Sequence, residues 1–215
     1  MTEEIAAALR GLASAFEHYP QRPVLQRCPH CGPPVRVAEV DLFWLSLKLG
    51  NTVGDISDVK AFLPLLFERL VTTDELDGGI VLGKLAQQDW LSWPPPERLA
   101  VDTVIDAIWL ALLSEFPSRI GAFTDPADFL AAVATATVPV DGFLTVWDST
   151  HGEAADRHLA EFVNGAPFSG RLAPEVRAWI GRKSLRNRLL RAYERHHEDP
   201  EWSDAFARAH DLASL

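Results

Sequence analysis

Apolar residues recur along most of the chain with the spacing of amphipathic helices. Ile5, Leu9, Leu12 and Phe16 lie at i, i+4, i+7 and i+11, which predicts a helix capped by Thr2. The clearest period runs from Val101 to Leu113. The same pattern predicts further helices over about 37–49, 57–70, 82–90, 126–133, 153–163, 174–197 and 200–212, with a shorter apolar segment at 143–147.

Strand signals are nearly absent, since only 35–40 and 134–140 hold β-branched runs. We therefore expect an all-α protein of eight to ten helices, arranged as an irregular multi-helix bundle or a HEAT-like antiparallel helix stack. No fixed-period repeat is visible, which disfavours a solenoid. Residues 1–215 are predicted to form a single domain. The alternative is a subdivision into two halves. The cysteine-loop half would cover 1–120, and the C-terminal half would cover 121–215 and carry a basic helix over 174–197.

Composition and charge narrow the class of protein. The 215 residues are 47% hydrophobic and 23% charged, and the net charge is −10. These values are ordinary for a soluble globular chain, and the negative charge argues against non-specific binding to nucleic acid or to an anionic membrane. Glu3 and Glu4 stand where a secretory signal would be basic, and no apolar run approaches the length of a membrane span. We expect a soluble, cytoplasmic protein.

The charge is unevenly distributed. Between Arg171 and Arg195 the chain has eight basic and two acidic residues, so the remainder carries −16. One interpretation is a solvated helix that happens to be rich in arginine. The other is a docking face for an anionic partner or a phosphate, with Arg182, Arg186 and Arg191 as the partner-binding candidates.

Cys28-Pro29-His30-Cys31 is the segment whose residue types most clearly suggest a chemical function. The tetrapeptide equals the active-site motif of DsbA-like thiol oxidoreductases, but Gly32-Pro33-Pro34 prevents the helix that lowers the thiol pKa in that fold. The two thiolates could instead hold zinc with His30 and His18 as further ligands, although the spacing of a zinc finger is missing. The plainest interpretation is that two reduced cysteines help to pack a loop, stiffened by prolines, against the helices.

Several other segments are candidates for a functional site. Trp90 and Trp93 flank a turn before three prolines, where they either close the edge of a core or form an exposed partner-binding platform. His151, Glu153 and His158 lack the spacing of a metalloprotease helix. The segment 78–84 has glycines and a lysine without the spacing of a phosphate-binding loop. A site assembled from distant residues leaves no local motif, so an enzyme stays an alternative.

Taken in order, a set of short motifs resembles an uncharacterised bacterial protein family. The motifs, which cover roughly residues 16 to 113, are Tyr19-Pro20, Cys28-Pro29-His30-Cys31, Asp58-Val59-Lys60-Ala61-Phe62-Leu63-Pro64, Gly83-Lys84-Leu85, Trp90, Trp93-Pro94 and Glu97. The resemblance implies no activity and no catalytic residue. It implies that the cysteine loop and the Trp-Pro turn belong to one structural unit.

These observations favour a protein that acts by binding rather than by catalysis. We expect a helical protein-interaction module with a protein partner, either an adaptor or an immunity-type protein that neutralises a basic partner. No cofactor is expected from this interpretation. A zinc-stabilised helical module using Cys28 and Cys31 is the first alternative, and a thiol-dependent enzyme centred on the same loop is the second.

A triple substitution tests whether the basic helix is a surface. We predict that Arg182→Glu, Arg186→Glu and Arg191→Glu together leave the fold intact, because exposed charges contribute little to stability. Circular dichroism and thermal unfolding measure the outcome. An unfolded variant would mean that these arginines are structural and that no docking face exists there.

Overall fold

The fold is described by a computed structural model that covers residues 1–28, 30, 32–118, 120–166 and 174–215. Within these residues the α-helices are α1 (Glu3–Phe16), α2 (Leu42–Lys48), α3 (Ile56–Thr72), α4 (Gly78–Gln87), α5 (Pro95–Ser114), α6 (Pro126–Thr135), α7 (Asp141–Ser149), α8 (Glu153–Gly165), α9 (Pro174–Ile180), α10 (Lys183–Arg195) and α11 (Pro200–Leu212). Two short strands, β1 (Val24–Leu25) and β2 (Val35–Arg36), pair antiparallel, and the 3-10 turns are η1 (Val37–Glu39) and η2 (Trp90–Ser92).

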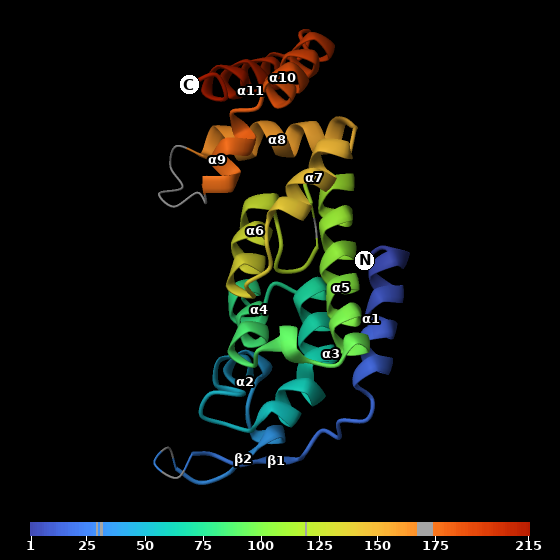
Figure 1. Ribbon diagram of the computed structural model, residues 1–215, viewed down its shortest axis with the longest axis vertical. Coiled ribbons are helices and arrows are strands. Elements are labelled where there is room, and N and C mark those ends of the chain that lie inside the picture. Colours follow the sequence, from blue (N-terminus) through green and yellow to red (C-terminus); the bar gives the residue numbers. More distant parts are fainter. Residues whose placement is uncertain (29, 31, 119, 167–173) are drawn as a thin grey trace. The chain divides into compact units, whose positions relative to one another are not determined.

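The predicted all-α class is confirmed (Figure 1). The eleven α-helices of the described residues slightly exceed the expected eight to ten. The extra helix comes from the segment predicted as one long helix over 174–197. That helix ends at Ile180, and Arg182 adopts an extended backbone before α10 begins. Gly181 stands at the break, where glycine commonly ends a helix.

Side-chain caps account for the boundaries that the periodicity placed wrongly. The apolar segment 37–49 is divided into η1 and α2, because the Asp41 side chain accepts a hydrogen bond from the Trp44 backbone N–H and starts a new helix. The helix expected over 82–90 starts earlier, at Gly78, since the Asp77 side chain accepts a hydrogen bond from the Ile80 N–H at 2.8 Å. The β-branched run 134–140 forms no strand, and α6 ends within it.

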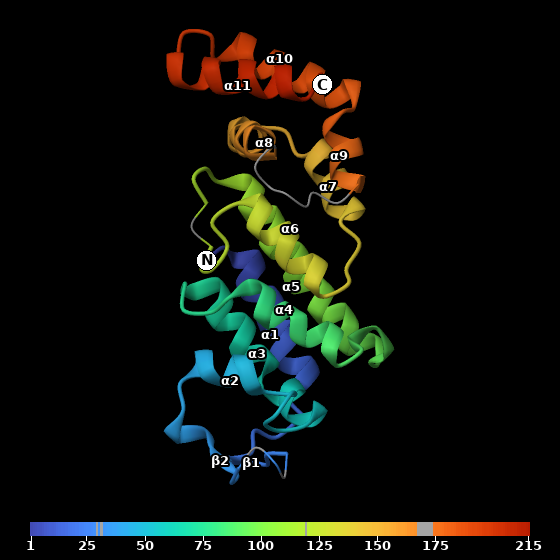
Figure 2. The same ribbon diagram turned by 90° about the vertical axis from the view of Figure 1, so that its left-hand side faces the viewer.

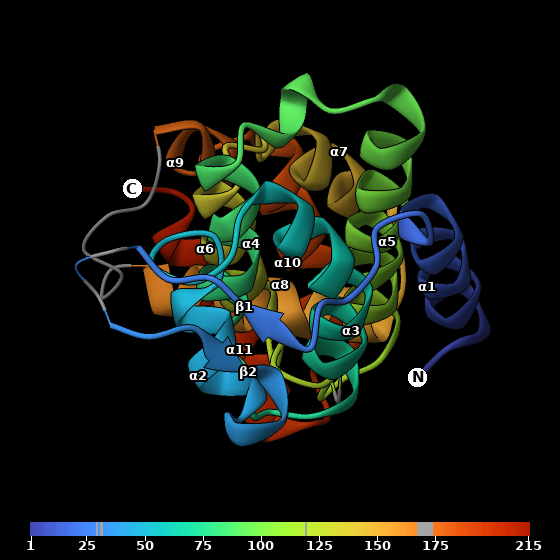
Figure 3. The ribbon, with the colours of Figure 1, turned by 90° about the horizontal axis from the view of Figure 1, so that it is seen from below.

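The chain divides into two compact units, each with its own core. Unit 1 comprises Met1–Ala111, Arg119–Thr124 and Asp128–Val138. Within it α3 contacts both α1 and α4, and α4 also contacts α2. Figure 3 looks onto the β1–β2 pair from below. The largest fully buried aromatic side chains of unit 1 are Phe16, Phe62, Phe67, Trp90, Trp109, Phe123 and Phe129.

Unit 2 comprises Leu112–Ser118, Asp125–Ala127 and Pro139–Leu215. In it α8, α10 and α11 pack against one another, and Figure 2 shows α10 and α11 as a pair of neighbouring helices. Trp147 of α7 lies 5.2 Å from Trp179 of α9 and 5.3 Å from Phe162 of α8, measured between ring centroids. These three aromatic side chains join α7, α8 and α9 in one core.

His158 of α8 is buried in the interior of unit 2. Its side chain is 2% exposed, and Nε2 donates to the Glu115 carbonyl at 2.9 Å. Burial lowers its pKa and outweighs the opposing effect of that hydrogen bond. The imidazole is thus held neutral against the Phe116 ring.

No helix in the described part of the chain combines the length and apolar character needed to cross a bilayer.

Candidate functional site

The motif residues of the family resemblance meet inside unit 1. Lys60 of α3 lies 2.7 Å from a carboxylate oxygen of Glu97 in α5, and its Nζ donates to the Tyr19 hydroxyl at 3.1 Å. Tyr19 in turn donates to Glu97 at 2.9 Å. The Lys60 ammonium also lies 4.5 Å from the centroid of the Trp93 ring. Side chains from four separate motifs therefore form one buried cluster.

The electrostatics of this cluster fit a structural role. Burial lowers the pKa of Lys60, but the hydrogen bonds to Glu97 and Tyr19 and the charge of Glu97 outweigh burial and leave the pKa raised. The lysine is therefore a firmly charged partner of Glu97. The cluster ties the segment after α1 to α3 and α5.

A second set of charges fixes the start of α3. The Arg22 guanidinium donates to Asp58 at 2.6 Å and to Asp55 at 2.7 Å. The hydrogen bonds to the two carboxylates raise the pKa of Arg22. Because Asp55 and Asp58 also form the capping box of α3, the arginine orders the same turn that starts the helix.

Of the two interpretations of Trp90 and Trp93, the exposed platform is not formed. The two side chains are 2% and 4% exposed. The Trp90 indole donates to the Ala136 carbonyl and the Trp93 indole to the Gln88 carbonyl, each at 3.0 Å. Their polar atoms are satisfied inside unit 1, so they close the core, as the alternative interpretation has it.

The cysteine loop lies partly outside the described residues. Pro29 and Cys31 are not described, and Cys28 carries no free thiol. His30 is exposed, and Nε2 of His18 lies 3.8 Å from a Glu97 oxygen. Within the described residues no three His, Cys, Asp or Glu side chains gather as metal ligands. Zinc binding by Cys28, Cys31, His30 and His18 stays a prediction, and it would first require reduction of Cys28, which is disulfide-bonded here rather than reduced.

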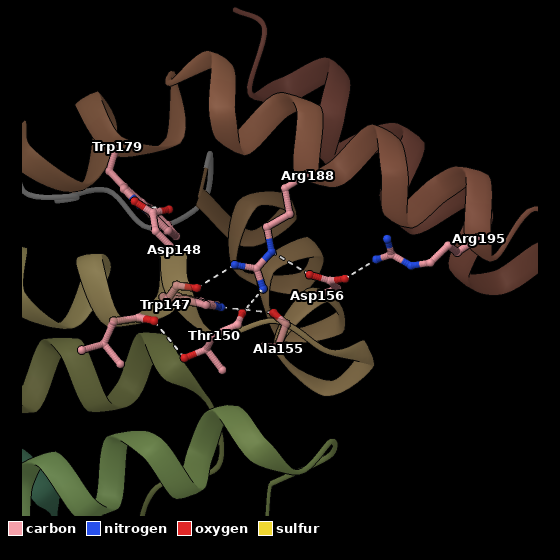
Figure 4. Close-up of polar contacts among 9 residues, drawn as sticks. Trp147, Asp148, Thr150, Ala155, Asp156, Trp179, Arg188 and Arg195 are labelled. Atoms are coloured by element: carbon pink, nitrogen blue, oxygen red, sulfur yellow. Dashed lines mark hydrogen bonds and ion pairs between the residues drawn. The ribbon is translucent and has the colours of Figure 1, made fainter.

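The basic segment of unit 2 has one arginine that is built into the core. Arg188 of α10 is 8% exposed. Its Nε donates to Asp156 of α8 at 2.6 Å, and its other nitrogens donate to the carbonyls of Trp147 at 2.6 Å and Thr150 at 2.7 Å (Figure 4). The guanidinium thus caps the C-terminal end of α7 while it pairs with α8.

Two neighbouring arginines support the same arrangement from the surface. Arg195 contacts the other oxygen of Asp156, which is itself 4% exposed. Arg182 lies 3.4 Å from Asp148, whose second oxygen accepts from the Trp179 indole at 2.9 Å. Of the three predicted partner-binding arginines, Arg182 therefore already has a carboxylate neighbour.

The remaining cations of α10 lie on its outer face. Lys183 and Arg191 are exposed and Arg186 is half-buried. Within the described residues none of the three makes an ion pair or a side-chain hydrogen bond. Leu190 and Tyr193 lie on the same face and are 42% and 39% exposed. We call these five residues the basic surface.

An open groove with a volume of about 780 Å³ adjoins the basic surface. It is lined by His151, Gly152, Glu153, Asp156, Arg188, Arg191, Arg195 and His196. Arg191 belongs to both features, so the positive charge of the basic surface continues into the groove. Glu153 is paired with Arg157, and Asp156 with Arg188 and Arg195. Among the groove arginines, Arg191 is therefore the one without a carboxylate partner in the described parts of the chain.

Only part of the basic surface could be predicted from the sequence. The local excess of arginine was visible, but the sequence does not tell which arginines are used internally. Helical spacing provides part of that signal: Leu185, Arg188 and Ala192 alternate with the exposed set in the period of a helix. The apolar members of the basic surface, Leu190 and Tyr193, were not predicted, because apolar residues of an amphipathic helix usually face the core.

Arg188 and Arg191 give a matched pair for testing the two faces of α10. We predict that Arg188→Met lowers the free energy of unfolding by about 3–5 kcal/mol, because it breaks the buried ion pair with Asp156, which is left with the more exposed Arg195, and removes the guanidinium donor from the Trp147 and Thr150 carbonyls. Arg191→Met should change it by less than about 0.5 kcal/mol. Urea unfolding followed by tryptophan fluorescence measures both. Equal effects of the two substitutions would contradict this division of the helix.

Comparison of this chain with family models, with curated proteins and with solved structures finds no match. Function therefore has to be argued from the geometry of the chain itself.

Proposed function

We propose that this chain is a non-catalytic protein-interaction module that binds an acidic segment of a partner protein on the basic surface. One observation carries the proposal: Lys183, Arg186 and Arg191 have no carboxylate partner among the described residues, while Leu190 and Tyr193 beside them are exposed. Unpaired cations around exposed apolar side chains supply both parts of a protein interface, the electrostatic complementarity and the apolar contact.

The residue types suit this role. Arginine and tyrosine are enriched at the energetically important centres of protein interfaces, and both bring large contact areas. Leu190 lies at the middle of the outer face of α10, with Arg186 and Arg191 on either side. A partner segment with an apolar residue flanked by acidic residues would match that order.

The charge of the whole chain favours a short acidic protein segment over a nucleic acid. Outside residues 171–195 the chain carries −16, which repels a long polyanion. A segment with a few carboxylates is small enough to contact the basic surface alone. Glu194, which is exposed on the same face, further limits how many negative charges can be accommodated.

Selection from a random peptide display library tests this function without assuming a partner. We predict that the full chain enriches peptides with several acidic residues around an apolar one, and that their affinity falls as NaCl is raised. Lys183→Glu, Arg186→Glu and Arg191→Glu together should weaken binding of the selected peptides at least about tenfold, as measured by fluorescence anisotropy.

The matched control makes the same change in charge away from α10. Arg36→Glu, Arg69→Glu and Arg208→Glu alter three exposed cations and should leave the affinity within about twofold. The proposal fails if the selected peptides are not acidic, or if the two triple variants bind them equally.

A further inference from the structure

A second groove lies within unit 1, beside α4. It has a volume of about 520 Å³ and is lined by Leu47, Asn51, Asp77, Gly79, Ile80, Gly83, Lys84, Ala86, Gln87 and Thr135. Its residues come from α4, from α6 and from the C-terminal end of α2 with the turn that follows. The groove includes the segment 78–84, whose glycines and lysine lack the spacing of a phosphate-binding loop.

Two glycines one helical turn apart keep this groove open. Gly79 and Gly83 lie at i and i+4, so they occupy one face of α4. A Cβ added at Gly79 would lie 3.2 Å from an Asp77 oxygen, and one added at Gly83 would lie 3.7 Å from the Thr135 hydroxyl. A branched side chain at Gly83 would thus occupy the space between α4 and Thr135.

The lysine that lines the groove has little to compensate its charge. Lys84 is 1% exposed, and its Nζ donates to the Leu47 carbonyl at 3.2 Å. No carboxylate of the described residues lies within ion-pair distance of that nitrogen. An ammonium carries three N–H donors, and buried charges are normally paired. One neutral acceptor is a poor substitute for an anion.

Lys60 provides an internal comparison, since both lysines are buried in the same unit. Lys60 has the Glu97 carboxylate at 2.7 Å and its pKa is raised. The pKa of Lys84 is lowered, first by burial and then by the charge of Lys48. Lys60 forms an ion pair within the chain, whereas no carboxylate in the described part of the chain pairs with Lys84.

We propose that the unit 1 groove binds a small molecule through an anionic group that pairs with Lys84. Carboxylates and phosphates share the required chemistry. The walls fit a compact ligand, because Leu47 and Ile80 offer apolar contact while Asn51, Gln87 and Thr135 offer hydrogen bonds. This site is separate from the basic surface and does not depend on the proposed function.

The ammonium signals of the lysines test this site directly. The chain has four lysines, Lys48, Lys60, Lys84 and Lys183, so a full-length sample labelled with ¹⁵N-lysine gives a spectrum with few signals. We predict that the Lys84 signal shifts saturably when acetate or inorganic phosphate is added at constant ionic strength. The Lys60 signal should stay in place, and the anion with the lower saturation midpoint identifies the preferred ligand chemistry.

Two variants separate binding from folding. Gly83→Val fills the groove from a half-buried position of α4 without removing Lys84, and should weaken the response of the Lys84 signal at least tenfold while circular dichroism stays unchanged. Gly11→Val is the matched control, because a Cβ at Gly11 meets nothing within 4 Å, and should leave the response intact. A Lys84 signal that moves equally with chloride, or equally in Gly83→Val, overturns the proposal.

Discussion

The organisation of unit 2 depends on one buried guanidinium. Arg188 reaches from α10 to the Asp156 carboxylate of α8 and to the last carbonyls of α7. A charge removed from water is stable only when its donors are satisfied, and here the acceptors come from α8, from α7 and from the residue that follows α7. Arg188 thereby sets which side of α10 faces inward. The opposite side therefore faces outward, and it carries the cations that make no ion pair within the described residues.

The same reasoning distinguishes the buried lysines of unit 1. Lys60 is enclosed by Glu97, Tyr19 and Trp93, and therefore holds the ends of separate segments together. Among the residues that the structure describes, the hydrogen-bond acceptor of the Lys84 ammonium is a backbone carbonyl, that of Leu47. A cation whose partners lie within the chain is explained by the fold, whereas a cation that lacks them points to a ligand. Both proposals made for this protein follow from that distinction.

Much of the fold could be predicted from the sequence, because helical periodicity and caps are local properties. Thr2, for example, caps α1 as expected. The break at Gly181 was missed, since the apolar period continues across it.

The candidate site was harder to predict for a physical reason. Arg182, Arg186, Arg188 and Arg191 are the same residue type on neighbouring turns, and only the positions of Asp148 and Asp156 in space decide which of them is free. Likewise, the burial of Trp90 depends on the distant Ala136 carbonyl.

Helix α10 thus has one internal arginine and an outer face whose cations make no ion pair within the described residues. Exchange of the arginine Nε–H protons, followed by NMR on the full chain at neutral pH, distinguishes the two sides of the helix. Because the Nε–H of Arg188 is bonded to Asp156 and buried, its exchange requires a local opening that costs about 3 kcal/mol or more. It should therefore be at least about hundredfold slower than exchange at Arg186 and Arg191. Equal exchange rates at the three arginines would contradict the account.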